Sequence, residues 1–297
     1  MKKALLSVFF CFVLTVSLQA QPYIDLFRTK YQYFPTANFS NDSKSKVSGT
    51  QWTTSLFLPI ETKKKNAIII AAEYSLLGFS VTGDTSFTSK LSSKIALLGY
   101  NKKWKNEKWK TLFMAQMKVN THSIKVRSGD YQFGGVVLFD YKRKSNLNYH
   151  FGLYYNREYF GSFFVPLLGI DWRIDSTLSL FGDIPNKMSL EKKFSKKFYA
   201  GISYTSCTAT YRADDALSPD DYIREGDKFW SHNEIKVYAN IYLTKYVVVF
   251  VEAGRTLGRM FEVYRDKEVL AIPRIAFRKS EDSFLVNGGL AYRFRLD

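Results

Sequence analysis

The sequence predicts an all-β fold, a transmembrane antiparallel β-barrel of fourteen strands, with twelve strands as the alternative. Apolar and polar residues alternate over segments of about ten residues, the length with which a tilted strand crosses a bilayer. Aromatic residues make up 17% of the chain, and many stand near the ends of these segments, where amphipathic rings meet the membrane surface. After the N-terminal leader, no apolar run approaches the roughly 18 residues that a membrane-spanning helix requires.

The beginning of the chain has the organisation of a secretory signal peptide. Two lysines precede an apolar run at residues 4–16, and Ala20 stands at the expected cleavage site. The run is shorter than the roughly 20 residues that a spanning helix needs. We therefore expect residues 1–20 to be removed and residues 21–297 to form a single domain in the outer membrane of a Gram-negative bacterium.

The clearest alternation lies in the last predicted strand, residues 284–296. Apolar side chains occupy every second position on one face, whereas the other face carries asparagine, glycine and arginine. The pattern recurs at residues 109–120, 131–142, 147–158 and 230–244. A closed sheet explains it, because lipid offers no hydrogen bonds and every backbone group must pair within the barrel. A soluble β-sandwich or lipocalin-like barrel is the alternative, although the strands of such folds are usually shorter.

The strands are expected at residues 23–33, 49–60, 67–79, 89–102, 109–121, 131–142, 147–158, 164–174, 176–184, 186–194, 197–211, 229–244, 246–255 and 284–296. The hairpin of the ninth and tenth strands is the weakest, because these strands are short and meet at Pro185, which cannot donate a backbone hydrogen bond. Twelve strands result if this hairpin leaves the wall. Longer connections are expected at residues 35–48, 81–88, 122–130, 213–228 and 256–283, the last with an extra hairpin.

The chain carries 43 Lys and Arg against 27 Asp and Glu, a net charge of +16. Basic clusters lie at predicted strand ends, where they can meet the phosphates of outer-membrane lipid and lipopolysaccharide. Nucleic-acid binding uses the same charge, but an exported barrel rarely meets nucleic acid, and we expect no such partner. Two cysteines and three histidines are too few for a cysteine-based zinc site, and we expect no metal or cofactor. The acidic segment 213–228 is interpreted as a solvated loop, because it matches no calcium-loop motif.

Charged and histidine side chains on the polar faces are the candidate lumen-lining residues. They are Glu73, Lys118, Asp140, His150, Glu158, Asp171, Arg173, His232, Glu234, Lys236 and Arg293, and Lys110 and Arg295 share these faces. Pairing across the barrel would plug and stabilise it, whereas charges that line water would set the ion preference of a channel. A barrel of this predicted size is wider than the eight-stranded kind that side chains fill.

A search for catalytic constellations predicts no catalytic residue. Ser189 and Lys192 have a Ser-x-x-Lys spacing, but an offset of three places them on opposite faces of a strand. The pairs His122-Ser123 and Ser231-His232 straddle the sheet for the same reason unless a loop bends the chain. A lipid-modifying hydrolase of the outer membrane, acting through such a His and Ser, is kept as the alternative function.

Two stretches carry a resemblance to known proteins. The final strand ends in an aromatic-tipped pattern with Tyr292 and Phe294, which resembles the signal read by the barrel-assembly machinery, although three residues follow the last phenylalanine. Residues 166–172, 181–185 and 198–204 read PLLGIDW, FGDIP and FYAGISY. Together they look like an uncharacterised family of Gram-negative outer-membrane barrels that is known only as a domain of unknown function. The resemblance implies the barrel and its location, and it implies no activity.

The sequence therefore favours a passive role. We expect a porin-like small-solute pore or a structural barrel with a lumen of mixed charge. The expected partners are outer-membrane lipid, lipopolysaccharide and the barrel-assembly machinery.

Overall fold

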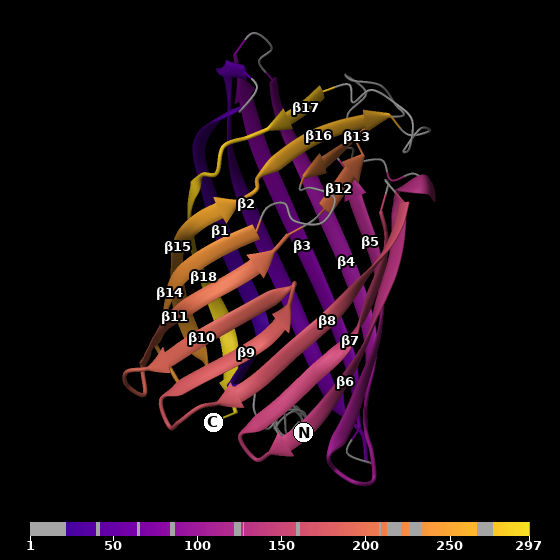
Figure 1. Cartoon of the computed structure of the whole chain (residues 1–297), viewed down its shortest axis with the longest axis vertical. Helices are drawn as coiled ribbons and strands as arrows, with labels where there is room; N and C mark the ends of the chain where they lie inside the picture. Colours follow the sequence, from indigo (N-terminus) through magenta and orange to yellow (C-terminus); the bar gives the residue numbers. More distant parts are fainter. Residues whose placement is uncertain are drawn as a thin grey trace, which may run out of the picture.

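The computed structural model describes residues 22–39, 42–63, 66–83, 87–121, 126, 128–158, 161–207, 209–212, 221–225, 233–265 and 276–296. Within them, fourteen antiparallel strands close into one barrel, because the last strand pairs back onto the first (Figure 1). Tyr23 pairs with Arg295, so the described chain begins and ends at the same end of the barrel. We call this the turn end and the opposite one the loop end.

Most neighbouring barrel strands are also neighbours along the chain, which short connections between antiparallel strands allow. The first seven are β1 (Tyr23–Phe39), β2 (Asp42–Glu61), β3 (Ala67–Thr82), β4 (Phe87–Lys103), β5 (Trp109–Thr121), β6 (Tyr131–Lys144) and β7 (Leu147–Glu158). The other seven are β8 (Gly161–Arg173), β9 (Leu178–Ile184), β10 (Lys187–Lys193), β11 (Phe198–Ser206), β14 (Asn233–Tyr242), β15 (Val247–Leu257) and β18 (Phe284–Arg295). A short 3₁₀ turn, η1 (Ser128–Asp130), precedes β6.

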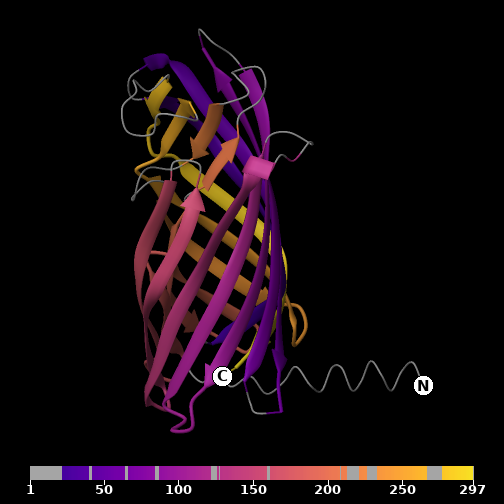
Figure 2. The same ribbon diagram turned by 90° about the vertical axis from the view of Figure 1, so that its right-hand side faces the viewer.

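Four shorter strands continue the wall at the loop end: β12 (Ala209–Arg212), β13 (Asp221–Glu225), β16 (Met260–Arg265) and β17 (Ala276–Lys279). They pair with one another in this order. Arg212 of β12 then bridges to Thr121 of β5, and Ser280 bridges to Phe39 of β1. The wall at the loop end therefore runs from β5 directly to β12 and bypasses β6–β11, and Figure 2 shows β3–β5 rising beyond the ends of β6–β8.

The prediction of fourteen strands is confirmed, and the twelve-strand alternative is wrong. β9 and β10 pair with each other and with β8 and β11, so the hairpin belongs to the wall. Pro185 lies in the turn between them, where its missing backbone N–H interrupts no ladder. The extra hairpin expected within residues 256–283 is present as β16 and β17.

Several connections that we predicted as loops contain strand. β1 extends to residue 39 and β2 begins at residue 42, with two irregularities in their register. β3 and β4 extend into residues 81–88. Residues 221–225 of the acidic segment form β13. The prediction was wrong here because polar composition indicates exposure to water, and a paired strand at the loop end is also exposed to water.

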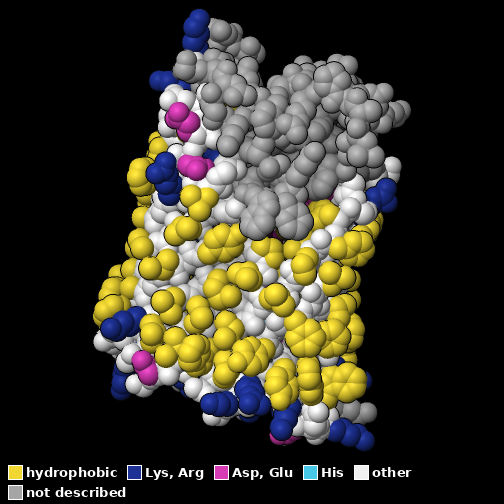
Figure 3. Space-filling view, viewed as in Figure 1, with side chains coloured by type: hydrophobic (Ala, Val, Ile, Leu, Met, Phe, Trp, Pro, Cys, Tyr) yellow, Lys and Arg dark blue, Asp and Glu magenta, His cyan; other side chains and the backbone are white. Residues whose placement is uncertain are grey.

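The outer surface is the face that meets lipid. Side chains that alternate outward are large, apolar and exposed, such as Leu98, Val237 and Phe284 at 61%, 59% and 68%. Figure 3 shows these apolar side chains covering the middle of the barrel, with Lys and Arg at its lower rim. At the turn end, Tyr246 and Phe294 pack with ring centroids 4.7 Å apart. Among the described residues, no helix has the length and apolar character needed to cross a membrane.

The largest apolar core fills the barrel near the loop end. Inward side chains of β1–β4, including Phe34, Phe79 and Leu91, pack against Tyr211 of β12 and Leu285 of β18. Leu91 and Leu285 have no exposed surface. The strand β12 therefore closes part of the lumen from within, because its side chain occupies space that an open cylinder would leave to water.

Candidate lumenal site

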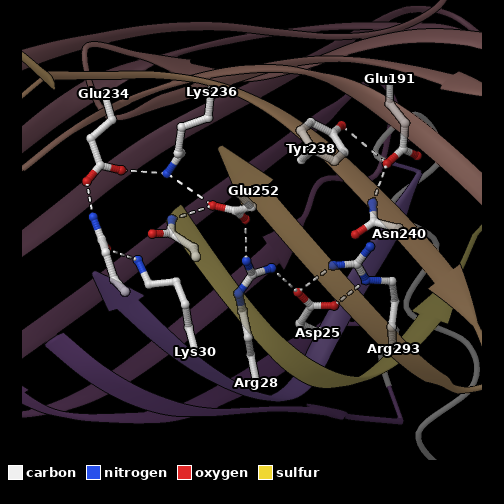
Figure 4. A network of polar contacts seen from close by, with 12 residues as sticks. Asp25, Arg28, Lys30, Glu191, Glu234, Lys236, Tyr238, Asn240, Glu252 and Arg293 are labelled. Atoms are coloured by element: carbon white, nitrogen blue, oxygen red, sulfur yellow. Dashed lines mark hydrogen bonds and ion pairs between the residues drawn. The ribbon is translucent and has the colours of Figure 1, made fainter. Parts of the chain in front are cut away.

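The inner face of the barrel divides into two regions. The first, which we call the charged arc, lies on β10, β18, β1, β14 and β15. It contains Asp25, Arg28, Lys30, Glu191, Glu234, Lys236, Glu252 and Arg293 (Figure 4), together with Arg295, which contacts Glu191. The second, which we call the apolar belt, lies on β5–β8 and contains Met114, Val136, Tyr154, Phe163, Val165 and Leu167. Strand alternation directs the belt side chains inward. On β1, the register shift between Asp25 and Phe27 brings Asp25 onto the same inner face as Arg28 and Lys30.

The charged arc holds the first and last strands of the barrel together. The guanidinium of Arg293 on β18 contacts Asp25 on β1, with Nε 2.5 Å and Nη2 3.0 Å from the two carboxylate oxygens. Arg28 joins this pair, with Nη1 3.3 Å from Asp25 and Nη2 2.7 Å from Glu252 on β15. Arg293 is fully buried. Such two-pronged contacts satisfy a buried carboxylate well, because guanidinium and carboxylate match in shape.

The same arc continues toward the loop end. Lys236 places its Nζ 2.5 Å from Glu234 and 3.2 Å from Glu252 (Figure 4). Gln32 on β1 donates from its side-chain amide to Glu234 at 2.6 Å and accepts from Lys30 at 2.8 Å. Every charge named here has an opposite partner or an amide, which offsets the cost of removing it from water.

Contacts also cross the lumen near the turn end. Glu191 on β10 accepts from the guanidinium of Arg295 on β18 at 3.0 Å and from the amide of Asn240 at 3.1 Å. The rings of Tyr23 on β1 and Phe181 on β9 meet edge to face, with centroids 5.6 Å apart. Three barrel strands, β11, β14 and β15, separate β10 from β18 along the wall. These side chains therefore fill part of the cross-section at the turn end.

A smaller polar cluster occupies the turn end of β6–β8. His150 has Nδ1 2.5 Å from Asp140 and Nε2 3.0 Å from Asp171, so both ring nitrogens contact carboxylates. No hydroxyl nucleophile is hydrogen-bonded to this imidazole in the described part of the chain, and a serine hydrolase needs that contact. Within the same ranges, no group of three or more His, Cys, Asp or Glu side chains has the arrangement of a metal site.

A third polar cluster ties the loop-end strands to the barrel wall. Lys118 on β5 contacts Glu158 on β7, and Glu158 also accepts from the hydroxyl of Thr210 on β12. Gln132 on β6 donates to the Thr210 hydroxyl at 3.3 Å. All four side chains are buried. The cluster therefore fixes β12 over the ends of β5, β6 and β7.

A hollow space, which we call the chamber, remains between these clusters. Its apolar compartment has a volume of about 350 Å³ and is lined by the apolar belt with Pro185 and Asn186 of the β9–β10 turn. Its polar compartment, of about 260 Å³, is lined by residues that include Glu73, Ser75 and Lys118. The two adjoin, because Gln116, Tyr154 and Ser206 line both. Apolar walls with a few polar groups are typical of small-molecule sites.

The structure places most candidate residues on the inner face, but in separate clusters. Arg173 lies at the turn end of β8, where its backbone N–H donates to Asn146 at 2.9 Å, and Lys110 pairs in register with Asp140. His232, His122, Ser231 and the signal peptide lie outside the described residues. The rings of Tyr292 and Phe294 meet edge to face at the turn end, with centroids 5.6 Å apart. Their role as an assembly signal stays a prediction, as does the passage of solute along the candidate residues.

Sequence reasoning missed two parts of the interior. It omitted Arg28, Glu191 and Glu252, although strand alternation directs them inward. It also omitted Asp25, which shares the inner face with Arg28 only because the register shifts between Asp25 and Phe27. It also assigned a polar face to β8, whereas residues 163–168 are apolar without a break. A continuous apolar run indicates a strand that is apolar on both faces, and this signal could have revealed the belt.

Comparison with protein families gives a match over residues 16–293 to the model of a domain of unknown function, DUF6268. The chain belongs to the DUF6268 family. No curated protein matches it in sequence. This DUF6268 protein is a closed β-barrel with the exposed apolar outer face of a membrane protein.

Solved structures share the barrel fold at low identity. An outer-membrane channel from Pseudomonas putida F1 matches with a TM-score of 0.47 and 10% identity over 93% of this chain and 96% of that one. A mutant of the TodX monoaromatic hydrocarbon channel gives 0.40 and 10% over 95% and 93%. The translocator domain of the autotransporter NalP from Neisseria meningitidis gives 0.37 and 11% over 99% and 97%. These likenesses concern the fold of the DUF6268 barrel alone.

Proposed function

We propose that this barrel is a passive channel that passes small solutes across the outer membrane through the chamber. The observation that carries the proposal is a hollow of two adjoining compartments, of about 350 and 260 Å³, inside the barrel. Volumes of a few hundred Å³ with mainly apolar walls suit small organic molecules. Tyr154 and Gln116 border both compartments and supply hydrogen-bonding groups in mid-chamber.

The interior supports a narrow, selective path over a wide aqueous pore. Toward the loop end, Tyr211 and Leu285 belong to a packed apolar core, and toward the turn end Tyr23 and Arg295 reach across to β9 and β10. A freely conducting pore needs a continuous water-filled lumen. Packed side chains at both ends favour solutes that can lose their water, which apolar molecules do at little cost.

The hydrolase alternative gains no support at His150, whose ring nitrogens both contact carboxylates. The plugged structural barrel is the competing interpretation, because most charges of the arc pair with one another. The channel and the structural barrel differ in how outer-membrane permeability responds when the chamber is filled. A structural barrel gives the same outer-membrane permeability whether or not its chamber is filled.

The test is uptake of radiolabelled 1-naphthol, a small molecule with one hydroxyl, by Gram-negative cells that express the chain. We expect faster uptake than in cells without it, and we expect the chamber-filling variant Gln116→Trp to remove most of the gain. Phe113→Trp is the matched control, because Phe113 lies on the same strand but faces lipid and is 46% exposed. Heat-modified migration on a gel checks that each variant folds.

Two outcomes contradict the proposal. Equal uptake by cells with the wild type, with Gln116→Trp and without the chain would leave a structural barrel. Large conductance steps of the refolded chain in a planar bilayer, unchanged by Gln116→Trp, would show an open aqueous pore that does not pass through the chamber. Small or absent steps together with naphthol uptake are the expected result.

A further inference from the structure

The wall of the barrel is incomplete beside the apolar belt. β8 pairs with β9 only from Leu168, opposite Ile184, to Arg173, opposite Ser179. The remaining part of β8, residues 161–167, pairs with β7 on one side. Among the strands that the structure describes, none is hydrogen-bonded to its other side. Figure 1 shows the same step, because β8 rises well beyond the tip of the β9–β10 hairpin.

Four described segments border this gap: β8, the β9–β10 turn, β11 and β12. The β9–β10 turn, with Pro185 and Asn186, forms the edge toward the turn end. β11 ends at Ser206 on the far side, and β12 then crosses to β5, where Arg212 bridges to Thr121. Because Lys118, Glu158 and Thr210 hold β12 over β5–β7, the crossing is fixed in place. We call the framed gap the window.

A gap of this kind is unusual in a membrane barrel. Lipid offers no partners to an unpaired strand edge, so barrels normally close completely. Non-helical backbone without a strand partner is tolerated at membrane depth only where it is buried in protein or lines a water-filled cavity. β8 also carries Pro166 in its one-sided part, and proline belongs at strand edges because it has no N–H to donate. The local sequence therefore suits an edge at this position.

The rim of the window lies at the depth of the hydrocarbon. The outward side chains around it are Phe164 and Leu168 on β8, Ile184 on β9 and Ile202 on β11, which are 59%, 61%, 47% and 53% exposed. Large exposed apolar side chains mark the lipid-facing band of a barrel. The same positions along the strands carry Val165 and Leu167 on the inner side, so apolar surface lies both outside and inside the window.

The apolar compartment of the chamber lies directly behind the window. Its lining includes Val165 and Leu167 from the edge of β8, Pro185 and Asn186 from the turn, and Ser206 from the end of β11. These residues are the frame of the window itself. About 350 Å³ holds on the order of ten to fifteen water-sized groups at about 30 Å³ each. Amide and hydroxyl groups at Asn156, Asn186 and Ser206 can bind one polar group of the occupant.

We propose that the window is a side portal through which a small, mostly apolar molecule with one hydrogen-bonding group moves between the chamber and the hydrocarbon of the membrane. This inference rests on the proposed function, because it specifies the route and the solute class of the same chamber. A solute that enters sideways never has to pass the packed core around Tyr211 or the cross-lumen contacts of Glu191. The packed ends of the barrel are therefore compatible with a single path that runs from the chamber through the open side.

The test places a reporter thiol inside the chamber. In a chain with Cys207→Ser, the variant Val136→Cys puts a thiol of similar volume on β6, across the apolar compartment from the window. The protein is refolded into phosphatidylcholine vesicles and exposed to lipid-soluble N-phenylmaleimide or to a sulfonated, water-soluble maleimide. We expect the lipid-soluble reagent to label the thiol at least about tenfold faster. This factor corresponds to a difference of about 1.4 kcal/mol in the activation barrier.

Blocking the window then separates the portal from the chamber. Asn186→Trp, added at the rim, should slow labelling by N-phenylmaleimide about tenfold, and Ser206→Trp should do the same from the opposite side. Lys196→Trp in the exposed β10–β11 turn, at the other end of the barrel, is the matched control and should change nothing. Heat-modified migration and the unfolding midpoint confirm that the tryptophan variants fold.

The outcomes that overturn the inference are distinct from those that overturn the proposed function. If neither reagent labels Val136→Cys, the chamber is inaccessible and both fail. If both reagents label it at similar rates and only Gln116→Trp slows them, the chamber is used but is entered along the axis, and the portal alone fails. Fast labelling by the lipid-soluble reagent that survives both rim tryptophans also overturns the portal.

Discussion

The charged arc and the apolar belt line the same barrel, but the lumen is filled beside the arc and hollow beside the belt. In the arc, Arg293 is fully buried and contacts Asp25 through two nitrogen atoms. The lumen beside it is filled. In the belt, Val165 and Leu167 face a hollow. The difference follows the topology, because the arc includes the seam where β18 meets β1, and the belt ends at the short β9–β10 hairpin.

The same alternating sequence pattern can therefore close the barrel with ion pairs in one region and line a cavity for solute in another. Ion pairs between strands at the seam, such as Arg28 with Glu252, add long-range contacts where the chain ends must be joined. Removing one partner of a buried pair is costly, whereas apolar side chains that face a cavity have few neighbours to lose. Four substitutions test this contrast, and the expected effect decreases from the first to the last.

The largest effect is expected at the seam. Arg293→Gln removes both contacts to Asp25 and leaves this partly buried carboxylate with Arg28 as the cation that still contacts it. We expect a loss of about 3–5 kcal/mol in the free energy of unfolding, measured by urea titration in detergent micelles. Asp25→Asn combined with Arg293→Gln should recover most of it, and uptake of 1-naphthol should stay unchanged. A loss below about 1 kcal/mol, as for a surface pair, would remove the seam from the comparison.

The next effect concerns the lipid face of the belt strands. Leu168 faces outward and is 61% exposed, whereas its neighbour Leu167 faces the chamber. Leu168→Lys should cost about 2–4 kcal/mol if the position lies near the bilayer midplane, measured as the free energy of unfolding from lipid vesicles. In detergent micelles, where water reaches the barrel surface more easily, the same substitution should lower the free energy of unfolding by less. Equal stability of wild type and variant in vesicles would place the window outside the hydrocarbon.

A charge inside the belt tests the chamber without weakening the wall. Met114→Lys puts an ammonium among apolar lining residues, and an apolar solute cannot compensate for its lost hydration. We expect uptake of 1-naphthol to fall about tenfold, equivalent to about 1.4 kcal/mol, with little change in unfolding. Met114→Leu is the control and should behave as wild type. Equal uptake by both variants would show that solute avoids the belt.

The smallest effect is expected in a turn outside both regions. Asp175 accepts the backbone N–H of Thr177 at 2.6 Å, its hydroxyl at 2.8 Å and the N–H of Leu178 at 2.9 Å. These bonds, led by the Thr177 backbone N–H, hold the pKa of the exposed Asp175 carboxyl below its usual range. A lowered pKa in the folded state means that the stabilisation is present above about pH 4 and is lost as pH falls through the folded-state pKa.

The measurement is the unfolding midpoint as a function of pH for wild type and Asp175→Asn. The variant should unfold slightly earlier than wild type at neutral pH, and the difference should vanish in acid. The charged arc and the apolar belt are untouched by this change, so uptake of 1-naphthol should be the same for both. A difference that persists at low pH would assign the stabilisation to turn shape and not to the carboxylate charge.

The residue pattern was sufficient to predict the strands but not what the strands enclose. Residues 284–296 alternate so regularly that β18 could be placed from sequence, and Glu234 and Lys236 could be directed inward. The contact of Glu234 with Gln32 could not be predicted, because Gln32 lies on β1, which only the closed barrel brings near β14. The role of β12 in the wall was also missed, since a bridge from Arg212 to Thr121 has no local signature.

Alternation with a period of two is a local property of the backbone, so the sequence alone was enough to predict the fold class, the fourteen strands and the face of most side chains. The tertiary structure alone decided that the seam is filled, that the belt is hollow and that the wall has a window. These features depend on strand register and on contacts such as that between Asp25 and Arg293, which lie 268 residues apart, and register is settled only when the sheet closes.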